Sequence, residues 1–294
     1  MNPKSSSLLR LIGSMLIYGT IGLFRRALPV SSAFLAMFRG FTGSFFLLLF
    51  LVLLHKKPDW KAVRAKVIPL LVSGGIMGLN WILLFESYRY TTVAISTLCY
   101  YMAPVFVILA SPFLLHQSLE RRKVISLLLS LVGMCFITGI FSLANQESGR
   151  LPGFLLGLGA AVLYACVILI NQKLVSVPSF ERTIVQLFSA GIVVLPYAFL
   201  TGGFSSLSLT LTSSLLLLVI GIVHTAFAYL LYFSSMDGLS AQTVAIISYL
   251  DPVTAVLLSV FLLHEPMDVL GMIGTILILF AAVYAENGSS KSSI

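Results

Sequence analysis

Charged side chains are scarce in this chain of 294 residues, since Asp, Glu, Lys and Arg make up only 10% of it, whereas 59% of its residues are hydrophobic. The mean hydropathy is +1.04. Soluble domains carry about 25% charged residues, so this composition excludes a soluble fold of this length. Polar segments long enough to form a soluble domain are also missing. The chain is therefore predicted to be an all-α integral membrane protein.

Cysteine is rare as well. Cys99, Cys135 and Cys166 all lie within apolar runs, with no paired spacing and no companion histidines. This pattern argues against a disulfide or a metal site and favours small buried hydrophobic side chains. We expect no metal and no cofactor.

Catalytic and channel motifs are missing too. His264–Pro266 resembles the start of a zinc-protease helix, but the second histidine is absent. Leu71–Gly74 lacks the first glycine of a serine-nucleophile turn, and no glycine-rich phosphate loop occurs. An enzyme is therefore not expected. A channel is the stronger alternative, although no Asn-Pro-Ala pair and no Gly-Tyr-Gly filter run is found.

Long apolar runs fill the rest of the chain. A helix needs about 20 apolar residues to cross the hydrocarbon core of a bilayer. Ten candidate spans are predicted near residues 10–27, 31–54, 67–86, 92–115, 124–143, 152–172, 183–201, 213–235, 240–263 and 269–286. The first run is short and is followed by Arg25 and Arg26 rather than by a small-residue cleavage site, so we expect it to be an uncleaved helix.

Basic residues are distributed unevenly between the predicted loops. One side of the membrane collects thirteen of them: Lys4, Arg10, Lys56, Lys57, Lys61, Arg64, Lys66, Arg121, Arg122, Lys123, Lys173, Arg182 and Lys291. The other side holds four: Arg25, Arg26, Arg89 and Arg150. The positive-inside rule predicts that both termini are cytoplasmic, in the plasma membrane. The net charge of +8 follows mostly from this bias, and the short loops with few aromatics do not indicate nucleic-acid binding.

An internal repeat divides the chain. Residues 101–116 (YMAPVFVILASPFLLH) and 249–264 (YLDPVTAVLLSVFLLH) share nine of sixteen residues at a shift of 148. Five predicted spans in each half would make the second half, 146–294, run through the membrane in the opposite sense to the first, 1–145. Inverted repeats of this kind place a substrate site at mid-membrane that opens to each side in turn, as in secondary transporters.

Several motifs resemble one transporter family. Pro-Val occurs within both the fourth and the ninth predicted spans, Arg39 lies within the second, Tyr-Arg-Tyr-Thr-Thr-Val-Ala follows the third, and Glu265 follows the ninth. Together they resemble the drug/metabolite transporter superfamily, in its ten-helix EamA-type branch. The resemblance implies a secondary carrier of small metabolites such as amino acids or amines, commonly an exporter. Two positions depart from the family pattern: Asp251 stands where Glu is common, and Gln117 stands where an acid often occurs.

Ionisable residues inside the predicted spans are the main candidates for function, because each costs about 2.5–3.5 kcal/mol at a helix centre. Asp251 directly precedes Pro252, which is expected to free the carbonyl of Ser248, as Pro104 does for Tyr100 in the other half. We expect Pro104 and Pro252 to act as hinges. Asp251 is predicted to bind a cationic part of the substrate or to carry a coupling proton; a structural pair with Arg39 is the alternative.

Other polar residues add candidates. Arg39 lies about 12 Å from the outer end of its span, where binding a substrate carboxylate and a structural role are both open. His224 is expected either to relay protons or to bond to a neighbouring helix. Glu86 is expected to form an interfacial pair with Arg89, with a proton-coupling role as the alternative.

Aromatic residues lie deep within the spans rather than at their ends: Tyr18, Trp81, Tyr100, Tyr101, Tyr164, Tyr229 and Tyr249. Tyr18, Trp81, Tyr100 and Tyr249, with Asn80, are predicted to line a cavity for an amphipathic or cationic ligand. We expect a small-molecule substrate, possible proton coupling, lipid as the surrounding partner and a monomer. A non-transporting sensor or scaffold remains an alternative.

Overall fold

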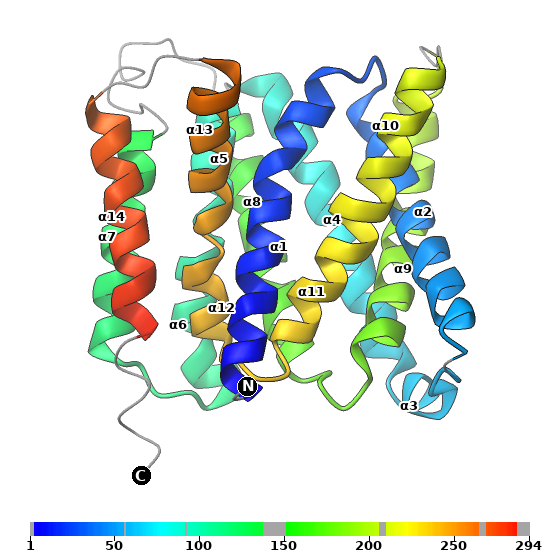
Figure 1. The fold of residues 1–294 in the computed structure, drawn as a ribbon, viewed down its shortest axis with the longest axis horizontal. Coiled ribbons are helices and arrows are strands. Elements are labelled where there is room, and N and C mark those ends of the chain that lie inside the picture. Colours follow the sequence, from blue (N-terminus) through cyan, green and yellow to red (C-terminus); the bar gives the residue numbers. More distant parts are fainter. Residues whose placement is uncertain are drawn as a thin grey trace.

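The structure is a computed structural model that describes residues 3–55, 57–91, 93–137, 151–205, 210–264 and 269–286, all of whose regular elements are helices (Figure 1). These are α1 (Pro3–Arg26), α2 (Ser32–Leu53), α3 (Trp60–Ala65), α4 (Val67–Tyr90), α5 (Val93–Tyr100), α6 (Ala103–Leu115), α7 (Arg121–Ile137), α8 (Leu151–Gln172), α9 (Ser179–Leu200), α10 (Leu211–Gly221), η2 (Ile222–Phe227, a π-helix), α11 (Ala228–Ser235), α12 (Ala241–Ile247), α13 (Leu250–Leu263) and α14 (Val269–Glu286).

Eight helical segments of the described residues are long and apolar enough to cross a membrane. They coincide with eight of the ten predicted spans, and the glycine-containing first run is among them, as Lys4–Phe24. The fifth predicted span, 124–143, extends beyond the described residues. The tenth corresponds to the shorter apolar helix Val269–Ala285. The chain is thus a multi-pass membrane protein, and the count of ten spans stays a prediction.

Local sequence signals set several of the helix starts. The hydroxyl of Ser31 accepts a hydrogen bond from the backbone N–H of Phe34 and caps α2, and Ser240 caps α12 through Thr243 in the same way. Such caps satisfy backbone donors that have no partner inside the helix. They lie at the two ends of the bundle.

The helices stand side by side, with α1 in the middle of the view and the α7–α14 pair at its left edge (Figure 1). The helix α1 packs against α11 and α13, α4 packs against α8 and α9, and α2 packs against α9. A close approach joins the outlying pair, since a Cβ on Gly274 would lie 2.5 Å from the carbonyl oxygen of Gly133. The helix α1 begins and α14 ends at the same, lower end of the bundle.

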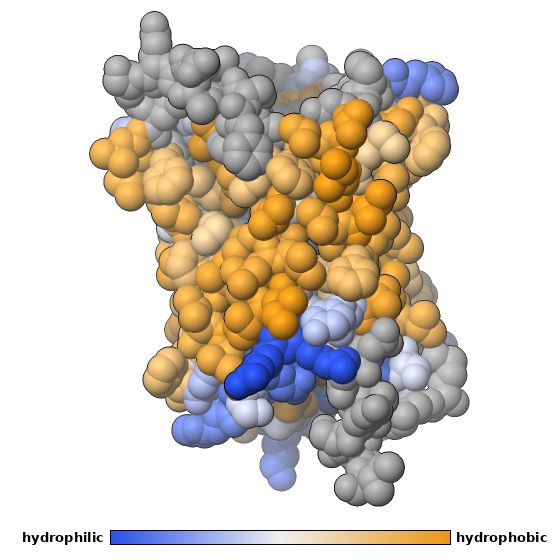
Figure 2. Space-filling model, turned by 90° about the vertical axis from the view of Figure 1, so that its left-hand side faces the viewer, coloured by the Kyte–Doolittle hydropathy of each residue, from blue (hydrophilic) through white to orange (hydrophobic). Residues whose placement is uncertain are grey.

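The surface has the pattern of a membrane protein. Seen from the side of α7 and α14, its middle is covered by hydrophobic residues, and hydrophilic groups gather mostly toward the lower end (Figure 2). Interhelical bonds show which loops share that end: Glu181 at the start of α9 accepts a bond from the backbone N–H of Asp59, and Lys123 at the start of α7 donates to Ser240. The basic starts of α3 and α7 therefore lie at one end of the molecule.

Two of the membrane-crossing segments are broken at mid-length. The helices α5 and α6 are separated at Tyr101–Met102, so Pro104 is the second residue of α6, and α12 and α13 are separated at Ser248–Tyr249, so Pro252 is the third residue of α13. Both prolines therefore begin new helices, where a missing N–H costs little. The expectation that Pro252 frees the carbonyl of Ser248 is wrong: that oxygen accepts a hydrogen bond from the N–H of Asp251, at 3.2 Å, within the turn that joins the two helices.

Left-handed backbone conformations recur at matched positions. Among the described residues they occur at His55, His116, Gly202 and His264, with φ of 53°, 54°, 67° and 54°. His264 lies 148 residues after His116 and Gly202 lies 147 after His55 (264 − 116 and 202 − 55). Each follows a membrane-crossing helix, so corresponding helices in the two parts of the chain end through the same backbone geometry.

Candidate functional site

Seven aromatic rings connect two charged residues of the membrane-crossing segments, Arg39 and Asp251, and we call this set the ring path. Starting at Arg39 and ending at Asp251, the rings in order are Trp81, Tyr229, Tyr18, Tyr232, Tyr164, Tyr100 and Tyr101. Neighbouring ring centroids are between 5.4 and 6.4 Å apart, the range of stacked and edge-to-face pairs. Six of the seven come from α1, α4, α5, α8 and α11, so the ring path forms only when the whole bundle assembles.

Asp251 lies at one end of the ring path, in the first turn of α13. The hydroxyl of Tyr101 donates to its Oδ2 at 3.0 Å. An acidic side chain is stabilised at this position because the first backbone N–H groups of a helix point toward it. Both residues are only half-buried.

Arg39 of α2 lies at the other end. Its Nε donates to the hydroxyl of Thr225 at 2.9 Å, and its guanidinium carbon lies 5.3 Å from the centroid of the Trp81 ring, in a cation–π contact. Within the described residues no ion pair joins Arg39 to Asp251, so each charge keeps its own neutral partners. The direct ion pair between Asp251 and Arg39, which was the structural alternative in the sequence analysis, is therefore not formed among the described residues.

Two adjacent residues of the π-helix η2, His224 and Thr225, contact different helices. Thr225 faces Arg39 on α2, whereas the Nε2 of His224 lies 2.7 Å from the hydroxyl of Thr20 on α1. His224 is only 2% exposed, and its ring packs on Phe24 at 4.7 Å. Single π turns within α-helices are frequent at functional sites. For His224, the sequence left open a proton relay or a bond to a neighbouring helix, and the structure shows the contact with Thr20 of α1.

Two other candidates lie beside the ring path: Asn80 precedes Trp81, and the ring of Tyr249 lies 6.1 Å from that of Tyr101. Asn80 is 1% exposed and donates to the carbonyl of Ala160 at 2.6 Å, which joins α4 to α8. Tyr249 is fully buried and donates to the carbonyl of Tyr101 at 2.8 Å, which joins the two broken segments. Both hydrogen bonds join neighbouring helices.

Glu86 lies at the end of α4 and accepts hydrogen bonds from Arg89, at 3.0 and 3.1 Å, and from the hydroxyl of Tyr197 on α9. The pair with Arg89 was predicted. The bond to Tyr197 joins α4 to α9 near the upper ends of these helices, and Glu86 lies five residues after Trp81 of the ring path on α4.

Several site residues were not selected from the sequence. Tyr101, Tyr164 and Tyr229 were noticed only as deep aromatics, and Tyr232 and Thr225 were missed. Tyr232 follows Tyr229 by three residues and so shares its helix face, a signal that could have identified it. Thr225 has no comparable signal, because only the π turn brings it to Arg39.

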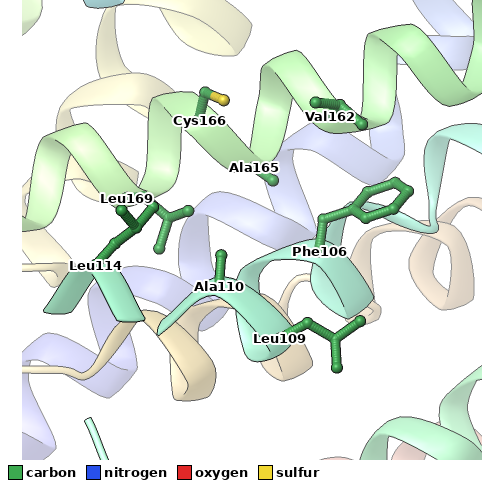
Figure 3. Close-up of a pocket in the computed structure, with 8 residues that line it drawn as sticks. All are labelled: Phe106, Leu109, Ala110, Leu114, Val162, Ala165, Cys166 and Leu169. Carbon is green, nitrogen blue, oxygen red and sulfur yellow. The ribbon is translucent and has the colours of Figure 1, made fainter. Parts of the chain in front are cut away.

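A separate apolar pocket lies between α6 and α8, with a volume of about 330 Å³ (Figure 3). All of its lining side chains are apolar: Phe106, Leu109, Ala110, Leu114, Val162, Ala165, Cys166 and Leu169. Such a lining cannot bind a polar ligand by itself.

The fold is that of a multi-pass membrane protein with charged and aromatic groups inside a helical bundle. A family model described as "EamA-like transporter family" matches the chain twice, over residues 5–139 and 151–285. The chain therefore belongs to the EamA-like transporter family.

The relatives agree with this assignment. The uncharacterized transporter YxxF of Bacillus subtilis is 28% identical over 276 residues, which cover 94% of this chain and 88% of that protein. An uncharacterized transporter of Archaeoglobus fulgidus is 25% identical over 92% of this chain and 93% of its own. One solved crystal structure, 20% identical, matches 99% of both chains with a TM-score of 0.85, and this likeness concerns the fold alone.

Proposed function

We propose that this protein is a secondary active transporter that moves a small polar or amphipathic metabolite across the plasma membrane by alternating access. The observation that carries the proposal is the ring path, which connects an acid and a base, neither in an ion pair with a described residue, inside a bundle whose surface is apolar. Aromatic faces suit amphipathic or cationic ligands, and the two charges suit amino acids, amines and related compounds. The family resemblance favours export.

The proposed architecture is ten membrane-crossing helices in two inverted repeats, residues 1–145 and 146–294. It is supported by the two matches of the family model and by the matched left-handed residues. The packing also repeats: α8 packs against α4 and α6 as α1 packs against α11 and α13, and α2–α9 and α7–α14 pair corresponding helices of the two halves. The boundary between the halves lies outside the described residues.

In the proposed cycle, the breaks before Pro104 and Pro252 act as hinges, and Asp251 binds a cationic group of the substrate or a coupling proton. Glu86 and His224 are secondary candidates for proton coupling. The basic residues at the end where α1 begins and α14 ends support cytoplasmic termini. The internal repeat supplies both halves of a transport path, which favours a monomer.

Flux measurements in proteoliposomes test this function. A carrier should show saturable uptake and counterflow, in which unlabelled substrate on one side drives labelled substrate to the other. We expect Asp251→Asn to abolish uptake of cationic and zwitterionic compounds, while Glu120→Gln, directly before α7 and away from the ring path, leaves it unchanged. Non-saturating flux at high rates would instead indicate a channel, and normal transport by Asp251→Asn with unchanged pH dependence would contradict the role of Asp251.

A further inference from the structure

Two contacts hold the guanidinium of Arg39. Thr225 accepts from its Nε, and Trp81 lies against its face. Among the described residues the structure gives Arg39 no other hydrogen bond or ion pair, and the side chain retains accessible surface. The edge that carries the two Nη groups is therefore the part of Arg39 that these contacts leave available.

The hydroxyl of Thr225 accepts a hydrogen bond from Arg39 because its own O–H already donates to a backbone carbonyl. Its hydroxyl donates to the carbonyl of Ile220, five residues earlier, at 2.9 Å, and the side chain is fully buried. In a regular α-helix a threonine hydroxyl bonds to a carbonyl three or four residues earlier; the wider turn of η2 changes that register. The hydroxyl lone pairs consequently face Arg39, and the orientation of the guanidinium is fixed by a residue that cannot rotate freely.

A guanidinium with a free Nη edge matches a carboxylate through two parallel hydrogen bonds. In the bilayer interior such a charge requires an anionic or strongly polar partner. Asp251 is not this anionic partner of Arg39, since it bonds to Tyr101 at the other end of the ring path. The missing partner can arrive with the substrate.

We propose that Arg39 binds a carboxylate of the transported molecule and that Thr225, through the π turn η2, is the residue that positions it. This inference rests on the proposed transport function and restricts it, because it requires substrates to carry a carboxylate. Trp81 then lies beside the bound carboxylate. Thr225 itself does not touch the substrate.

Trp81 provides a direct measurement. The chain has two tryptophans, and the other, Trp60, lies on α3 and is 44% exposed. In a Trp60→Phe background, the fluorescence of the purified protein reports Trp81 alone. The probes are free acids paired with their primary amides: leucine with leucinamide, 4-methylpentanoate with 4-methylpentanamide, and benzoate with benzamide. We expect at least one acid to change the emission saturably and its amide to bind about tenfold more weakly or not at all.

The variants separate binding from positioning. Arg39→Gln should remove the preference for acids. Arg39→Lys should keep a weakened preference, because lysine retains the positive charge but lacks the two parallel N–H donors of the guanidinium. Thr225→Val should weaken acid binding about tenfold and leave amide binding unchanged, whereas Thr225→Ser, which keeps the hydroxyl, should resemble the parent. A Thr225→Val protein with parental affinity for acids would overturn the positioning role.

Other outcomes contradict the carboxylate site itself. Equal responses to acids and amides, no response to any acid, or a preference that persists in Arg39→Gln would each overturn it. A sodium chloride titration that reproduces the emission change and displaces the acids would assign the site to a free inorganic anion. If the panel compounds are still transported in proteoliposomes without any preference for acids, this inference fails alone; if none shows saturable flux, the transport proposal fails with it.

Discussion

At the scale of single residues, the polar groups inside this bundle fall into two kinds. Asp251 and Arg39 are half-buried and use neutral partners, which leaves their charges unneutralised. Asn80 and Tyr249 are almost fully buried and donate to backbone carbonyls of neighbouring helices. The first kind suits a ligand, whereas the second kind holds helices together.

Replacement of Asn80 tests this division. Asn80→Ala removes the hydrogen bond to Ala160 and leaves a buried carbonyl without that donor, so the free energy of unfolding should fall by about 0.6–1.7 kcal/mol. Thermal unfolding in detergent would show the loss as a lower midpoint. The substrate KM in proteoliposomes should stay unchanged. A raised KM with an unchanged midpoint would instead place Asn80 in the binding site, as its sequence position suggested.

At the scale of helices, the apolar runs were enough to predict the eight segments that can span a membrane, and the prolines were enough to locate the two breaks. Both signals are local in the sequence. The consequence drawn from Pro252 was wrong because the turn at Ser248–Tyr249 provides its own hydrogen bond.

The assembly of the ring path could not be predicted in the same way. It depends on which faces of five helices meet, and an almost uniformly apolar helix does not reveal its inward face. The deep aromatics Tyr18, Trp81 and Tyr100 lie on the ring path, and the ligand cavity predicted for them stays a prediction, whereas Tyr232 was missed. The π turn at Thr225 has no sequence signature that distinguishes it from the α-helix on either side.

The contact between α1 and α13 gives a prediction at this scale. Gly19 packs against the first turns of α13, where an added Cβ would lie 2.5 Å from the Cβ of Thr254 and 2.9 Å from the carbonyl oxygen of Asp251. Gly19→Ala should therefore push α1 away from Asp251 and reduce transport at least severalfold, which initial-rate flux measurements would record. Gly22→Ala is the matched control on the same helix, because no atom lies within 4 Å of its added Cβ.

The control should keep parental transport and be slightly more stable, since alanine favours a helix over glycine by about 0.5–1 kcal/mol. If both alanine variants transported normally, the close contact of α1 with α13 would be irrelevant to function.

At the scale of the whole molecule, alternating access requires that contacts between the two halves break at one end of the bundle. Gln242 of α12 donates to the hydroxyl of Ser111 on α6 at 2.6 Å, and both side chains are fully buried. Gln242 also donates to the carbonyl of Ser118. These bonds join the second half to the first at the lower end, next to the contact of Lys123 with Ser240. They would have to separate whenever the site opens to that side.

Cross-linking tests this requirement. In a protein whose three cysteines are replaced, Ser111→Cys with Gln242→Cys, joined by a short bifunctional thiol reagent, should stop counterflow almost completely, because one end can no longer open. Lys61→Cys with Ala65→Cys is the control: both residues are exposed and lie one turn apart on α3, at the same end of the bundle, so their cross-link joins no two helices. Its cross-linked form should transport normally. Undiminished counterflow in the fully cross-linked Ser111–Gln242 protein would mean that this end stays closed throughout transport, and would contradict a rocking motion about the two helix breaks.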